Sequence, residues 1–82
     1  MTVQMEYEAP TSFQIAAVAE ASLMSSSHLA LRKVRCHYDD GVLVLRGRLN
    51  SFFHTQLAQE TVAKIKGVKR VVNKIEVVNR AI

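Results

Sequence analysis

The feature that most constrains this sequence is an alternating segment followed by the dipeptide Asp40-Gly41. Residues 34–39 alternate apolar and polar side chains, as a half-buried β-strand does. Asp-Gly suits the positive φ angles of a two-residue type I′ turn, and residues 42–49 form the return strand. The sequence therefore predicts a β-hairpin whose turn fixes which residues lie opposite one another.

This register separates two faces of the hairpin. The apolar face pairs Tyr38 with Leu43, Cys36 with Leu45, and Val34 with Gly47. The largely basic face pairs Asp39 with Val42, His37 with Val44, Arg35 with Arg46, and Lys33 with Arg48. A one-residue slip would mix the two faces, so the register is well specified. Because Gly47 lacks a side chain, we expect it to admit a helix close to the sheet.

Two helices and a third strand are predicted around the hairpin. Residues 12–24 follow a capping hydroxyl at Thr11 or Ser12, and their apolar stripe is Ile15, Val18, Ala19 and Ser22 or Leu23. A second helix follows the N-cap Ser51, and its stripe is Phe53, Leu57, Ala58, Thr61, Val62 and Ile65. Residues 68–78 form the third strand, with Val71, Ile75 and Val77 inward. The partner of that strand stays open.

The order α-β-β-α-β predicts an α+β fold, a two-layer sandwich with a three-stranded sheet and both helices on one face. We expect a flexible tail over residues 1–10 and one domain over residues 11–82. No apolar run approaches about 18 residues, so no membrane span is predicted. The N-terminus lacks the features of a secretory signal. The chain as given is therefore expected in the cytoplasm, or at a membrane or in the periplasm if it was cut from a longer precursor.

The charge is divided unevenly along the chain. Residues 1–31 carry three acidic and no basic residues, a net charge of −3. Residues 32–82 carry all 11 Lys and Arg and four acidic residues, a net charge of +7. This asymmetry favours an acidic partner, such as an anionic lipid surface, an acidic protein or a nucleic acid, although excess bases also serve solubility alone.

Residues 34–78 carry an ordered set of short motifs. The set is Val34-x-Cys36, Asp40-Gly41-Val42-Leu43-Val44-Leu45-x-Gly47, Ser51 with its helix, and Gly67-Val68-x-x-Val71-Val72-Asn73-x-Ile75-x-Val77. This set resembles the BON domain of bacterial osmotically inducible and nodulation proteins. The resemblance implies a non-enzymatic binding module associated with the envelope or with phospholipids. Its motif residues are fold determinants, and Asn73 is expected to hold the turn entering the third strand.

Catalysis and metal binding find little support in the residues. No nucleophile signature surrounds the serines, the histidines or Cys36, and Cys36 is expected to be an inert core thiol. A single cysteine excludes an intrachain disulfide. The three histidines, His28, His37 and His54, share no helical ligand spacing. We therefore predict no enzyme activity, no cofactor and no metal site.

The candidate binding residues fall into three groups. The basic sheet face is the leading candidate, with Lys33, Arg35, His37, Arg46 and Arg48. Phe52 and His54 are a candidate membrane or partner contact, and a second basic cluster comprises Lys64, Lys66, Lys69 and Arg70. Two hypotheses follow: peripheral binding to anionic phospholipid through the basic face, or protein–protein interaction through a sheet edge or a homodimer. Nucleic acid is the less favoured partner because exposed aromatic residues are scarce.

Overall fold

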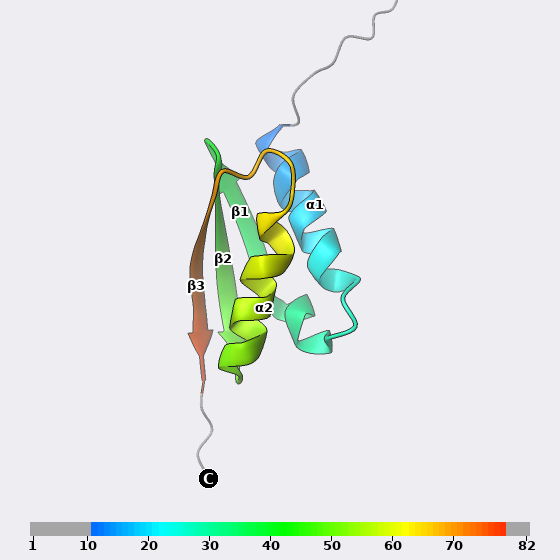
Figure 1. Ribbon diagram of the computed structural model, residues 1–82, viewed down its shortest axis with the longest axis vertical. Coiled ribbons are helices and arrows are strands. Elements are labelled where there is room, and N and C mark those ends of the chain that lie inside the picture. Colours follow the sequence, from blue (N-terminus) through cyan, green and yellow to red (C-terminus); the bar gives the residue numbers. More distant parts are fainter. Residues whose placement is uncertain (1–10, 79–82) are drawn as a thin grey trace, which may run out of the picture.

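The computed structural model describes residues 11–78, so the predicted tail over residues 1–10 lies outside the described residues. The elements are α1 (Ser12–Met24), the 3₁₀ helix η1 (Leu29–Lys33), β1 (Arg35–Asp39), β2 (Val42–Leu49), α2 (Phe52–Ala63) and β3 (Arg70–Val77). Figure 1 shows α1 and α2 on one side of a three-stranded sheet, which confirms the predicted two-layer α+β fold. No periodicity predicts η1, because a five-residue 3₁₀ turn has no apolar repeat.

The central strand of the sheet is β2, which pairs antiparallel with β1 and parallel with β3. The predicted hairpin register is confirmed for every residue pair between β1 and β2. Asp40 and Gly41 have φ angles of 49° and 86°, the positive values that the two-residue turn requires. The predicted pairings of Lys33 with Arg48 and of Val34 with Gly47 lie outside this ladder, because Lys33 ends η1, Val34 caps it and β1 begins at Arg35. The position of β3 beside β2 resolves the strand order.

Helix α1 begins with a capping box at Thr11. The Thr11 hydroxyl accepts a hydrogen bond from the Gln14 amide at 3.1 Å, and the Gln14 side chain accepts one from the Thr11 amide at 2.9 Å. The buried face of α1 is a line of residues spaced by four: Ile15, Ala19 and Leu23. Val18 is exposed, contrary to prediction, because it lies to the side of this line.

Helix α2 follows Ser51, whose side chain accepts a hydrogen bond from the His54 amide at 3.3 Å, as an N-cap does. The residues of α2 that are buried are Thr55, Ala58 and Val62. The predicted burial of Phe53 is wrong, since its side chain is 61% exposed. Phe53 stands two residues before Thr55, about 200° around the helix from the buried line. Val77 is also exposed, at the end of β3, although it was predicted inward.

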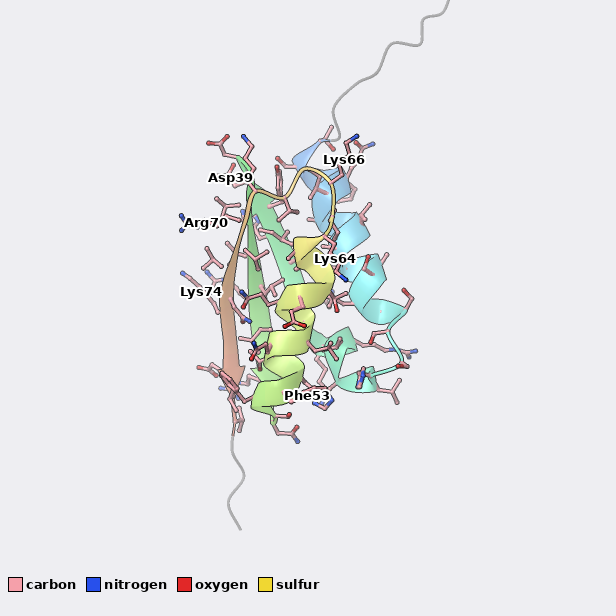
Figure 2. The ribbon with its side chains drawn as sticks, in the orientation of Figure 1. Asp39, Phe53, Lys64, Lys66, Arg70 and Lys74 are labelled. Atoms are coloured by element: carbon pink, nitrogen blue, oxygen red, sulfur yellow. The ribbon has the colours of Figure 1, made fainter. Side chains whose placement is uncertain are left out.

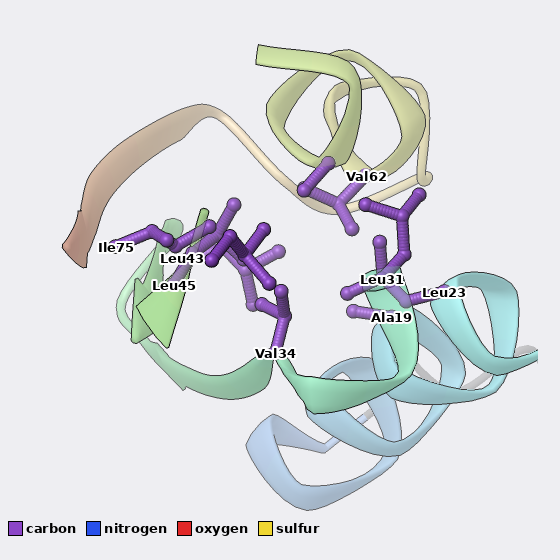
Figure 3. Packing of buried hydrophobic residues seen from close by; sticks show 10 residues of the cluster. Ala19, Leu23, Leu31, Val34, Leu43, Leu45, Val62 and Ile75 are labelled. Carbon is purple, nitrogen blue, oxygen red and sulfur yellow. The ribbon is translucent and has the colours of Figure 1, made fainter. Parts of the chain in front are cut away.

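The hydrophobic core lies between the sheet and the helices, and Figure 3 shows its packing. The central strand contributes Leu43, Leu45 and Leu49, which are almost fully buried. Every other element except β1 adds at least one buried side chain: Ala19 and Leu23 of α1, Leu31 of η1, Ala58 and Val62 of α2, and Ile75 of β3. Tyr38 and Cys36, both predicted inward, are half-buried at the margin of this core.

Two motif residues have roles that differ in detail from the predicted ones. A Cβ on Gly47 would lie 3.0 Å from the carbonyl oxygen of Lys33, so Gly47 admits the end of η1 to the sheet rather than an α-helix. The Asn73 side chain donates to the Thr55 carbonyl and to the Gln59 side chain, both at 3.1 Å. It also accepts from the Ile75 amide at 3.1 Å. Asn73 therefore links β3 to α2 instead of holding the turn before β3.

Candidate binding surfaces

Among the described residues, no helix covers the side of the sheet that faces away from α1 and α2, and we call this side the open face. Figure 2 shows Arg70 and Lys74 pointing away from the helices on this side. The open face holds five cations, two carboxylates, one histidine and three valines: Arg35, Arg46, Arg48, Arg70, Lys74, Asp39, Glu76, His37, Val42, Val44 and Val72. Its net charge is therefore +3 with His37 neutral.

Three cations form one row across the open face. Arg46 on the central strand lies opposite Arg35 on one side and Lys74 on the other. Neighbouring strands lie about 4.8 Å apart, and like charges directly opposite one another destabilise a sheet. Glu20 of α1 approaches Arg35 at 3.6 Å, but the Arg35 side chain stays 79% exposed. The row therefore gathers three cations on the open face, and an ion pair joins Arg35 of the row to α1.

The next row of the open face contains no Lys, Arg, Asp or Glu, and we call it the apolar strip after its two valines. It consists of His37, Val44 and Val72, and both valines are half-buried. Beyond the cationic row, Arg48 forms an ion pair with Glu76 at 3.1 Å on the exposed surface. An exposed pair of this kind contributes little to stability. The open face thus presents a cationic row beside an apolar strip.

A second surface lies at one end of the molecule, where η1, the start of α2 and the end of β3 meet (Figure 1). Of the eight large hydrophobic residues that are exposed within residues 11–78, five belong to these segments. We call this surface the apolar end, and it consists of Leu29, Phe52, Phe53, Val77 and Val78. Phe52, a candidate membrane or partner contact from the sequence, is 69% exposed.

Shared hollows and ring contacts connect the residues of the apolar end. Phe52 and Val77 line one hollow between α2 and β3. The Phe53 ring lies edge-on to His28, with ring centres 5.9 Å apart, and Leu29 follows His28 in the chain. Val78 lines another hollow together with Lys33 and Arg48. The apolar end is therefore bordered by two of the bases predicted to bind a ligand.

The candidate contact residue His54 lies inside this region and is half-buried. Its ring packs edge-on against Phe53 and His28, with ring centres 5.3 Å and 5.4 Å away. Its Nδ1 atom is buried and has no hydrogen-bond partner within the described part of the chain. His54 therefore packs against Phe53 and is half-buried, whereas Phe52 is exposed. No group of three His, Cys, Asp or Glu side chains in residues 11–78 is placed to hold a metal ion.

The predicted second basic cluster is divided by the structure. Lys64 and Lys66 lie on the helix side of the molecule, and Arg70 lies on the open face (Figure 2). The Lys69 side chain passes over the hairpin turn, where a Cβ on Gly41 would lie 2.9 Å from Lys69 Cδ. Arg70 therefore belongs with Lys74 and Arg46 instead of with the lysines of the α2 end.

Both free edges of the sheet carry a side-chain cap. On β1, the Cys36 amide donates to the Glu20 carboxylate at 2.9 Å. On β3, the Arg70 and Val78 amides donate hydrogen bonds toward β2. Successive amides of a strand point to opposite sides, so the Ile75 N–H, an odd number of residues from both, points to the free edge. That N–H donates to the Asn73 side chain. Each cap occupies a group that an added strand would need, which disfavours pairing at the edges.

The Cys36 thiol is half-buried beside α1. Burial, and secondarily the negative charge of Glu20, raises its pKa to about 12. A thiol with so high a pKa is protonated at neutral pH and is a poor nucleophile. The geometry around Cys36 therefore stabilises the fold, through the Glu20 contact to its amide, and offers no activated sulfur.

The architecture described above is that of a small α+β domain with one uncovered sheet face. The family model of the BON domain matches residues 11–79, and the chain belongs to this family. BON domains are non-catalytic binding domains. A search of curated proteins found no significant match. No helix within residues 11–78 is long and apolar enough to span a membrane.

Proposed function

We propose that this protein binds peripherally to anionic phospholipid surfaces, with the apolar end entering the lipid interface. The observation that carries the proposal is the exposure of two adjacent phenylalanines, Phe52 and Phe53, at the border of a strongly basic surface. Peripheral binding requires both apolar insertion and attraction to anionic headgroups. The apolar end and the bases beside it supply these two requirements together.

The geometry sets the expected strength of binding. Full burial of one phenylalanine contributes about 1.5–3 kcal/mol, and each base near an anionic surface adds about 1 kcal/mol. Lys33 and Arg48 share a hollow with Val78 of the apolar end, which supports contact between these bases and headgroups when that end is inserted. We therefore expect weak, reversible binding that depends on anionic lipid and weakens with added salt.

Vesicle sedimentation tests this proposal. We expect the protein to pellet with vesicles of phosphatidylcholine and phosphatidylglycerol, and much less with phosphatidylcholine alone. The double variant Phe52→Ser/Phe53→Ser should lower the affinity at least tenfold. Phe13→Ser is the matched control, because Phe13 is 82% exposed at the start of α1 and lies outside the apolar end. Equal binding to both vesicle types, or equal loss in both variants, would contradict the proposal.

A protein partner is the second candidate function, since the cationic row of the open face contributes no residue to the apolar end or to the hollow that Val78 shares with Lys33 and Arg48. The side-chain caps at Cys36 and Ile75 disfavour strand addition at either edge of the sheet. An interaction through the open face itself agrees better with its uncovered cations, and the nature of that partner is developed next.

A further inference from the structure

We infer that the open face is a docking site for an acidic amphipathic helix of a partner protein, lying across the three strands. This site is separate from the apolar end and goes beyond membrane binding. The inference rests on the cationic row of Arg35, Arg46 and Lys74, and on the apolar strip beside it.

The spacing of the cationic row matches that of acidic side chains on one face of a helix. The three residues lie opposite one another on strands about 4.8 Å apart. Acidic residues separated by one helical turn recur about every 5.4 Å along a helix axis. A helix at right angles to the strands therefore places successive carboxylates over Arg35, Arg46 and Lys74. Two to three helical turns, about 11–16 Å, cover the width of the sheet.

The apolar strip sets the second requirement for the partner. Val44 and Val72 lie two residues along their strands from the cationic row, about 6.6–7 Å away. An apolar stripe next to the acidic stripe of the helix would cover these two valines. Covering them removes apolar surface from water and adds a contribution that charge alone does not supply.

Other occupants fit this surface less well. Single-stranded nucleic acid binds sheet faces through aromatic side chains that stack on bases. The open-face residues include no Phe, Tyr or Trp, and His37 is the one ring among them. A second copy would bring two faces of like charge together, which opposes association. Strand addition would need the amides of Cys36 and Ile75, which are already bonded to side chains.

The test uses a fluorescent synthetic helix of about 14 residues. Glu recurs at i, i+3 and i+4 along one stripe of the helix, and Leu recurs at the same spacing along the adjacent stripe. We expect anisotropy to show salt-sensitive binding to the full chain, and the variant Arg46→Glu to weaken it at least tenfold. Lys64→Glu makes the same charge change on the helix side and should leave the affinity within twofold. Arg46→Glu places a carboxylate between Arg35 and Lys74, so we expect it to fold, which thermal unfolding would confirm.

Three results would overturn the inference. They are no binding of the helix, equal losses in Arg46→Glu and Lys64→Glu, and equally tight binding of a scrambled peptide or a single-stranded oligonucleotide. Vesicle binding is measured in parallel on the same variants. If Arg46→Glu loses the peptide but keeps vesicle binding, the two surfaces act separately, as inferred. A loss of vesicle binding equal to the loss of peptide binding would contradict the separation.

Discussion

The connection between β3 and α2 depends on one side chain, and Asn73→Ala should therefore destabilise the domain substantially. The substitution removes three hydrogen bonds of 3.1 Å, to Thr55, Gln59 and Ile75. At about 0.5–1.5 kcal/mol each, their loss lowers the free energy of unfolding by about 2–3 kcal/mol. A domain of this size has only about 0.05–0.15 kcal/mol of stability per residue, so the loss is a large share.

Urea unfolding followed by circular dichroism measures this effect. A loss of about 2 kcal/mol corresponds to a fall in melting temperature of about 8–16 °C for a domain this small. Asn73→Asp keeps an acceptor for the Ile75 amide but places a carboxylate oxygen against the Thr55 carbonyl and the Gln59 side-chain oxygen, so we expect a loss at least as large. Gln59→Ala removes only one of the bonds and should cost about 1 kcal/mol or less. An Asn73→Ala protein as stable as Gln59→Ala would refute the reasoning.

Two further predictions concern the hairpin and its neighbours. Gly47→Ala would bring a Cβ to 3.0 Å from the Lys33 carbonyl oxygen at a φ of +152°. We therefore expect thermal unfolding to show a clearly lower melting temperature, and an unchanged melting temperature would contradict this. Because burial and Glu20 raise the pKa of Cys36 from 9.0 to about 12, iodoacetamide at pH 8 should modify the folded protein at least tenfold more slowly than the urea-unfolded chain. Between pH 9 and 12 the Cys36 thiol of the folded state keeps a proton that the unfolded chain releases, so the free energy of unfolding should fall as the pH rises. Cys36→Ser should remove the part of this decrease that comes from the thiol.

Local signals explain why much of the fold is predictable from the sequence. The Asp40-Gly41 turn fixes the register of β1 against β2 without any information from the rest of the chain. The caps at Thr11 and Ser51 likewise place the starts of both helices, because each needs only its own first turn. The partner of β3 is not local information, since a parallel strand can follow a helix to either neighbour.

The binding surfaces were less predictable, because they depend on how separate elements meet. Phe53 fits the apolar stripe of an isolated helix, but the sheet selects the line through Thr55 and Ala58 as the buried one. That choice leaves Phe53 exposed beside Phe52 and creates the apolar end. Arg70, grouped by sequence with the lysines after α2, joins the open face only because β3 pairs with β2.

Fluorescence of a single introduced tryptophan tests the membrane proposal most directly, since the chain contains no tryptophan of its own. In Phe52→Trp the reporter stands at the apolar end, and in the matched control Phe13→Trp it stands on the exposed start of α1. We predict that anionic vesicles shift the Phe52→Trp emission to the blue and that brominated lipids quench it, whereas Phe13→Trp stays unchanged. Unchanged emission in both proteins, or equal quenching in both, would contradict insertion of the apolar end.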